Sequence, residues 1–139
     1  MPGRPGVFLD TSAWFASLSE RDQHHSRARP GYDALLGGSE RLVTSSLILA
    51  EMHGLLARRL GAGVALRFLD SAYGEPTHEV RRVTRDLERA AIDRWLRPFL
   101  DHRFSLCDAV SFELMRQEGI RAAFALDKHF AVAGFEMVP

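Results

Sequence analysis

Four carboxylates of this sequence lie within, or directly after, stretches of apolar residues. A carboxylate on a core-facing surface is costly unless a cation or a hydrogen-bond donor compensates it. One such residue could pair with an arginine, but four, at positions that a single fold could bring together, indicate a site for a hard metal ion. Mg²⁺ or Mn²⁺ would fit such a site, because both prefer oxygen ligands and retain waters that a substrate can displace. The four residues are Asp10, Glu51, Asp108 and Asp127.

The chemistry expected of this set is phosphodiester cleavage. Carboxylates packed together repel one another, and without a cation some of them would stay protonated. Two ions about 4 Å apart would activate a water and stabilise a leaving oxygen. The sequence is compatible with one bound ion or with two. No Cys/His pattern for structural zinc is present in the sequence.

The elements that must position these acids alternate between strands and helices. This alternation predicts an α/β fold with a central, mostly parallel sheet of about five strands and helices on both faces. The 139 residues, 46% of them hydrophobic, predict one domain over residues 1–139. Strands are expected at residues 6–9, 42–44, 78–83 (nearer an edge), 122–126 and 135–138. Helices are expected at residues 13–18, 22–36, 46–60, 64–72, 85–97 (halted by Pro98) and 106–118.

Each acid has a predicted place in that fold. Asp10 and Asp127 directly follow predicted strands, so both should point to the crevice beyond the carboxyl ends of a parallel sheet. Glu51 and Asp108 lie on the apolar sides of their helices. Both are expected to be held against the core near a helix N-terminus, which favours negative charge by up to about 1 kcal/mol.

Four segments that contain these acids resemble the motifs of the PIN domain, in their order and spacing. They cover nearly the whole chain and are residues 7–12, 45–51, 104–109 and 124–130. The resemblance is closest to the VapC-type toxins of toxin–antitoxin pairs, since Asp127-Lys128-His129-Phe130 followed by Gly134-Phe135 is typical of that group. It implies a small, Mg²⁺-dependent endoribonuclease with an RNA substrate, a VapB-like antitoxin partner and a homodimeric state.

The resemblance also implies roles for the four acids. Asp10 and Asp108 would be the firmest metal ligands, while Glu51 and Asp127 would complete the site and help to orient the attacking water. Many relatives carry a hydroxyl residue where this chain has Ala125. Its absence removes a possible supporting hydrogen bond near Asp127.

Taken singly, each acid has a plainer interpretation. Asp10 and Asp108 could cap helices, Glu51 could pair with an arginine in the core, and Asp127 could be a turn residue. Their joint occurrence in PIN-like order favours the metal site.

Neighbouring residues also have two interpretations. Ser105 is expected to cap the helix that carries Asp108, and Ser12 to cap a helix or contact a metal-bound water. His129 could touch a substrate phosphate or pack beside Phe130. Cys107 is interpreted as a small buried hydrophobic residue.

The bulk composition narrows the function class. The net charge is zero, so no global field attracts nucleic acid. The six arginines between residues 81 and 97 form either a solvated helix face or a local phosphate-binding patch. No apolar run approaches the roughly 18 residues that span a bilayer, no secretory signal is recognisable, and the single cysteine fits a reducing compartment. A cytoplasmic protein without a membrane segment is expected.

Other functions fit less well. A phosphatase of the haloacid dehalogenase type needs a second aspartate at position 12, where this chain has serine. A non-catalytic α/β signalling module of the phospho-receiver type needs further acids beside Asp10. A PIN nuclease that is not a toxin, or a PIN domain that has lost catalysis, remains an alternative; the presence of all four acids disfavours the second of these.

Overall fold

The centre of the molecule is a five-stranded sheet in which all strands are parallel, in the order β3-β2-β1-β4-β5. The computed structural model describes residues 3–74 and 76–139. The sheet confirms the predicted fold class, and the strands lie within a few residues of their expected places. They are β1 (Gly6–Leu9), β2 (Arg41–Ser45), β3 (His78–Arg81), β4 (Ala122–Phe124) and β5 (Glu136–Val138).

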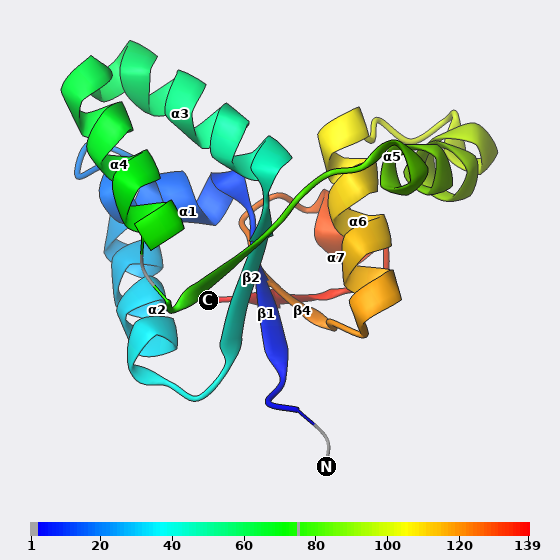
Figure 1. Ribbon diagram of the computed structural model, residues 1–139, viewed down its shortest axis with the longest axis horizontal. Helices are drawn as coiled ribbons and strands as arrows, with labels where there is room; N and C mark the ends of the chain where they lie inside the picture. Colours follow the sequence, from blue (N-terminus) through cyan, green and yellow to red (C-terminus); the bar gives the residue numbers. More distant parts are fainter. Residues whose placement is uncertain (1–2, 75) are drawn as a thin grey trace.

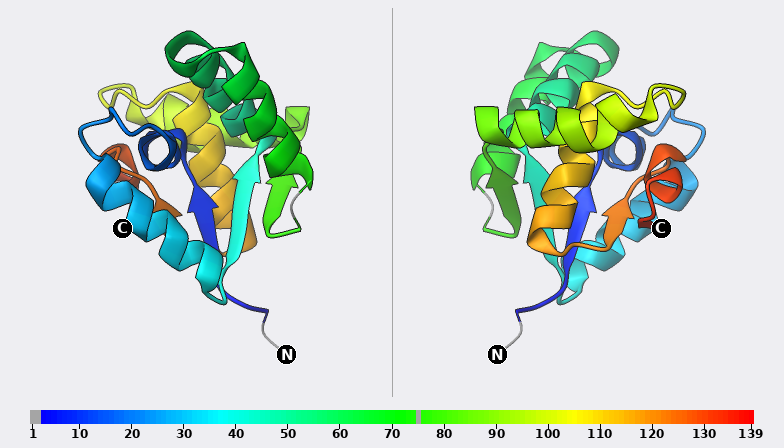
Figure 2. Two further views of the ribbon diagram at one scale, coloured as in Figure 1. Left: turned by 90° about the vertical axis from the view of Figure 1, so that its left-hand side faces the viewer. Right: turned by 90° about the vertical axis from the view of Figure 1, so that its right-hand side faces the viewer.

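Helices cover both faces of this sheet. Helices α1 to α4 lie on one side and α5 to α7 on the other (Figure 1), and views from the two sides show each group in turn (Figure 2). In the part of the chain that is described, no helix is both long and apolar enough to cross a membrane. The helices are α1 (Thr11–Leu18), α2 (His25–Gly37), α3 (Ser46–Leu60), α4 (Ala62–Gly74), α5 (Arg85–Ala91), α6 (Leu106–Glu118) and α7 (His129–Val132), of which α7 was not predicted.

The core is built around the central strand β1. Its residues Val7, Phe8 and Leu9 are all buried, as expected for a parallel strand that helices cover on both faces. On one side the rings of Phe112 and Phe130 meet edge to face at 5.1 Å. Aromatic packing on that face therefore helps to fix the position of the sheet that carries Asp10 and Asp127.

The segment after α5 differs from the prediction of one helix over residues 85–97. Helix α5 ends at Ala91, a π-helical turn follows over Ile92–Leu96, and Pro98 lies inside a 3₁₀ turn over Arg97–Phe99. Pro98 has no amide hydrogen to continue an α-helical pattern. In the π turn, Trp95 Nε1 donates a hydrogen bond to Glu113 Oε1 at 3.1 Å.

Glu113 is the buried carboxylate that fastens this segment to α6. Its side chain is 1% exposed. Arg116 donates two hydrogen bonds to it, at 3.0 and 2.8 Å, and Gln117 donates one at 2.8 Å. Arg94 Nε lies 3.3 Å from Glu113 Oε1. The charge is thus buried only together with its partners, as such groups require.

Strand β3 lies at an edge of the sheet, as predicted, and a chain of ion pairs crosses it. Arg41 lies 3.3 Å and Arg81 3.0 Å from the same oxygen of Glu79. Arg81 also forms a two-pronged contact with Glu118 at the end of α6, at 2.8 and 2.9 Å. These pairs connect β2, β3 and α6.

Candidate metal centre

Three of the four predicted acids converge beyond the carboxyl ends of β1 and β4. Asp10 follows β1 directly, and Asp127 lies in the loop after β4. The backbone amide of Asp10 donates to the carbonyl of Phe124 at 3.1 Å, which keeps the two strand ends side by side. Asp108 enters from the first turn of α6. The strand order therefore brings together residues that lie more than a hundred positions apart.

Asp10 is both a helix cap and a member of the acidic cluster. Its residue surface is 7% exposed, and its Oδ2 accepts hydrogen bonds from Ser12 N at 3.1 Å and Ser12 Oγ at 2.6 Å. The pKa of Asp10 is raised to about 6, chiefly by burial. The hydrogen bonds from Ser12 lower the pKa, and the charges of Asp108 and Asp127 raise it. Asp10 thus lies within the electrostatic field of both other carboxylates.

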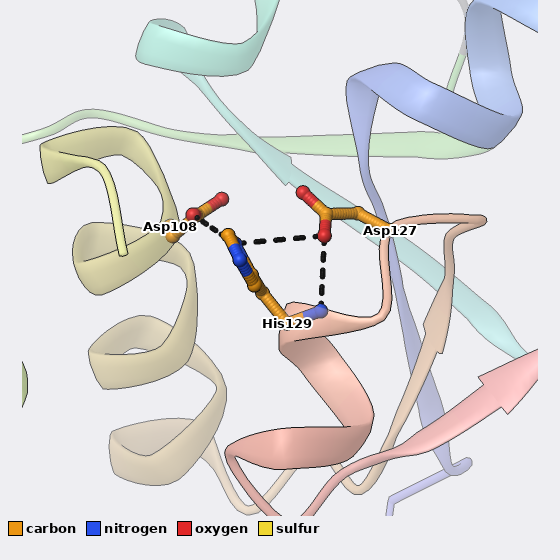
Figure 3. Close-up of side chains that lie close together, drawn as sticks. All are labelled: Asp108, Asp127 and His129. Carbon is orange, nitrogen blue, oxygen red and sulfur yellow. Dashed lines mark hydrogen bonds and ion pairs between the residues drawn. The ribbon is translucent and has the colours of Figure 1, made fainter. Parts of the chain in front are cut away.

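Asp108 and Asp127 face each other across the ring of His129 (Figure 3). His129 Nδ1 lies 2.9 Å from Asp108 Oδ2 and 3.5 Å from Asp127 Oδ1. One possible ligand atom from each of the three residues lies within 4.8 Å of the others. Asp108 also completes a capping box with Ser105, with both bonds at 3.0 Å. The cap predicted for Ser105 is confirmed.

The position of His129 was not predicted as part of the site. Asp127 Oδ1 accepts a hydrogen bond from the backbone amide of His129 at 2.9 Å, so the loop turns and the imidazole lies between the two carboxylates. The ring of Phe104 meets the imidazole edge to face at 5.4 Å. The available signal was a histidine two residues after a predicted ligand, within a turn-forming sequence.

Glu51 does not lie against the core as expected; it is exposed. Ile48 and Met52 occupy the fully buried stripe of α3, and Glu51 projects to one side of it. Its Oε1 accepts a hydrogen bond of 2.7 Å from Thr11 Oγ1. Glu51 is therefore held at the opening of the cluster, beside the first residue of α1.

Cys107 connects Glu51 with the rest of the cluster. Burial raises the pKa of the Cys107 thiol. The charge of Glu51 and a hydrogen bond between the thiol and Glu51 also raise this pKa, as do the charges of Asp10 and Asp108. The residue is half-buried rather than fully buried. The thiol therefore lies among three of the predicted acids instead of in a purely apolar environment.

Ser12 joins the two loops that carry Asp10 and Asp127. Its Oγ accepts hydrogen bonds from the backbone amides of Leu126 at 2.9 Å and Asp127 at 3.3 Å. Ala125, where many relatives carry a hydroxyl, is buried and 1% exposed. The hydroxyl of Ser12 therefore provides polar support for the Asp127 loop that Ala125 cannot.

The donor set fits a divalent cation that prefers oxygen. The charges of Asp108 and Asp127 raise the pKa of Asp10, so the three carboxylates repel one another. Within the described residues, none of the four predicted acids forms an ion pair with an arginine. Three carboxylates are suitable ligands for Mg²⁺ or Mn²⁺, and the imidazole of His129 lies beside them as a nitrogen donor.

A parallel sheet with an acidic cluster beyond its strand ends defines this chain as an α/β domain built around a candidate cation site. Residues 7–136 match the family described as the PIN domain, and the chain belongs to that family. The resemblance of the four acidic segments is thus confirmed, and the phosphatase and receiver alternatives are set aside.

Two VapC proteins are similar to this chain over most of its length. The chain is 36% identical over 135 residues to the "23S rRNA-specific endonuclease VapC20" of Mycobacterium tuberculosis, covering 93% of this chain and 95% of that protein. It is 26% identical over 126 residues to "Ribonuclease VapC26" of the same organism, with 90% of each covered.

Two solved structures have a similar fold. The crystal structure of M. tuberculosis VapC20, described as a sarcin–ricin-loop-cleaving toxin, superposes with a TM-score of 0.85 at 34% identity, covering 96% of this chain and all of that one. FitAcB from Neisseria gonorrhoeae gives a TM-score of 0.67 at 14% identity, with 96% of each covered, which shows the fold alone.

Proposed function

We propose that this chain is the toxin of a type II toxin–antitoxin pair and a divalent-metal-dependent endoribonuclease. The observation that carries the proposal is the convergence of Asp10, Asp108 and Asp127, which have no arginine partner among the described residues. Mg²⁺ is the proposed cofactor, with Mn²⁺ as a substitute. A bound divalent cation would relieve the mutual repulsion of these carboxylates and keep them ionised.

The four acids have different parts in the proposed reaction. Asp10, Asp108 and Asp127 hold the ion, which when bound supplies the positive charge that activates a water and stabilises the transition state at the phosphate. Ser12 orients Asp10 through a bond of 2.6 Å. Glu51 is exposed at the opening and held by Thr11, so its carboxylate can orient the attacking water and accept its proton.

We propose a loop of 23S ribosomal RNA as the substrate. The relative at 36% identity carries that specificity in its name, and the similar crystal structure is described as cleaving the sarcin–ricin loop. A cognate VapB-like antitoxin, a homodimeric state and a cytoplasmic location complete the proposal, on the basis of membership in the PIN family and similarity to VapC toxins.

The direct test is cleavage of a synthetic sarcin–ricin hairpin and of total RNA by the purified chain. Cleavage is expected with Mg²⁺ or Mn²⁺ and not with EDTA, and Asp108→Asn should be inactive while unfolding cooperatively like the parent. If the parent cuts no RNA with either ion, the nuclease proposal is wrong. Cleavage of total RNA but not of the hairpin would overturn only the substrate.

A further inference from the structure

A hollow of about 350 Å³ leads from the acidic centre along the groove between α1 and α3. One end is formed by Thr11, Ser12 and Asp127, so the hollow is continuous with the candidate metal site. Arg59 lies at the other end. A second hollow of about 220 Å³ continues from there, and Arg59 and Arg21 both line it.

Two stripes of side chains face each other across this groove. Glu51, Leu55 and Arg59 are spaced four residues apart on α3 and so share one helix face. Thr11 and Phe15 form the corresponding stripe on α1. The bond between Thr11 and Glu51 joins the stripes at the metal-site end. Arg59 lies about 12 Å further along the helix axis from Glu51, at 1.5 Å per residue.

The charges of the groove change along its length. Arg59 and Arg21 are exposed, and neither forms an ion pair with a carboxylate in the described parts of the chain. Asp22 also lines the hollow, but its Oδ1 accepts the backbone amide of His24 at 2.8 Å and so stabilises the turn. The groove is thus acidic at the candidate metal site and basic at the far end.

Half of the arginines in the segment at residues 81–97 are engaged by carboxylates. Arg81, Arg94 and Arg97 are paired with Glu118, Glu113 and Asp93. Arg82, Arg85 and Arg89 are exposed and form no ion pair with a carboxylate in the described parts of the chain, but none of the six lines either hollow. Within the two hollows, the guanidinium groups available to a phosphate are therefore those of Arg59 and Arg21.

We propose that the α1–α3 groove holds the RNA strand beside the bond that is cut, and that Arg59 binds a backbone phosphate of that strand. This inference rests on the proposed ribonuclease function. A guanidinium group matches the geometry and charge of a phosphate, and the apolar side chains of Phe15 and Leu55 form walls for the sugar or base. A cationic contact at a distance from the cluster holds the strand where the carboxylates alone would repel it.

The test compares Arg59→Ala with Arg58→Ala in cleavage of the sarcin–ricin hairpin with Mg²⁺. Arg58 is the matched control, since it is also exposed, lies next in sequence and borders neither hollow. Arg59→Ala should raise KM by about tenfold, the effect of a lost charged hydrogen bond, with kcat within about twofold. Its plot of log KM against log salt should be shallower by about 0.7 to 0.9. Arg58→Ala should match the parent.

Three results would overturn this inference in distinguishable ways. Equal KM values and salt slopes for both variants mean that Arg59 binds no phosphate. Equal kinetics together with a changed oligomeric state in Arg59→Ala alone mean that the groove is a protein interface. A parent protein that cuts no RNA refutes the proposed function, and the groove inference falls with it.

Discussion

Ser12 donates a hydrogen bond of 2.6 Å to Asp10 Oδ2, and the same hydroxyl oxygen accepts the backbone amide of Leu126 at 2.9 Å. One side chain thus orients the most buried acid and holds the loop that carries Asp127. Supporting bonds of this kind set the position and basicity of a ligand.

Ser12→Ala should impair the site without unfolding the protein. Loss of the hydroxyl leaves the Leu126 amide unsatisfied and frees the Asp10 carboxylate, so the free energy of unfolding should fall by about 1–2 kcal/mol. Metal affinity should fall by about tenfold or more. Urea unfolding and calorimetric titration with Mn²⁺ measure the two effects. Ser12→Thr, which retains a hydroxyl, should recover most of both; an alanine variant with parental metal affinity would show that Ser12 is not a positioning residue.

Asp10→Asn should stabilise the metal-free protein while removing its response to metal. Because the folded-state pKa of Asp10 is raised to about 6, the folded state binds the proton more tightly than the unfolded state does. This contribution to stability is present below the ordinary pKa and is lost as the pH rises through 6. At pH 7.5 in EDTA the asparagine variant should therefore be more stable by about 1–2 kcal/mol.

Thermal unfolding between pH 4 and 8, with and without Mn²⁺, checks this prediction. Added Mn²⁺ should raise the melting temperature of the parent, and its free energy of unfolding should increase by about 2.7 kcal/mol at a hundredfold excess over Kd. The melting temperature of Asp10→Asn should not change. An asparagine variant that is less stable than the parent in EDTA at pH 7.5 would show that Asp10 is primarily structural.

His129→Ala should change the metal preference of the site. The imidazole lies within 2.9 Å of Asp108 and 3.5 Å of Asp127, and imidazole suits Mn²⁺ better than Mg²⁺. The variant should lose about tenfold in Mn²⁺ affinity, an effect comparable to the loss of other site-supporting groups, and less for Mg²⁺. His102→Ala serves as the control, since His102 pairs with Asp101 outside the cluster. Equal or tighter Mn²⁺ binding in His129→Ala would mean that the ring leaves the site when metal enters.

Glu113→Gln tests the anchor between the π turn and α6. Burial raises the pKa of Glu113, but hydrogen bonds from Arg116, Gln117 and Trp95 outweigh it and lower the pKa to about 2. The stabilisation from this carboxylate is therefore present above its ordinary pKa of about 4.5 and is lost as the pH falls toward 2. The variant should be less stable by about 2–3 kcal/mol at pH 7. Urea unfolding of both proteins should show this gap narrowing below pH 4.5; a gap that does not change with pH would mean that packing, not charge, is lost.

The fold was predictable because short apolar runs alternate with amphipathic helices along the chain. That pattern also located Asp10, since an acid directly after a buried strand can point only to the crevice beyond it. The π turn at residues 92–96 was not predictable, since it accompanies a bond between Trp95 and Glu113 that joins separate helices.

The positions of the acidic side chains were predictable where the backbone topology alone determines them. Asp108 and Asp127 lie where expected. The exposure of Glu51 was missed because the spacing of apolar residues locates the buried side of a helix only to within about one residue. Met52, the next residue, takes the buried position. His129 was missed because its place depends on the turn that Asp127 makes with its amide.

The charged edge of the sheet limits how copies of this protein can associate. Arg41, Glu79, Arg81 and Glu118 are linked to one another across β3. A second chain that added a strand there would have to accommodate these fixed charges, a common protection against edge-to-edge pairing. Self-assembly that leaves this rim uncovered would instead use helical surfaces or the opposite edge of the sheet, at β5.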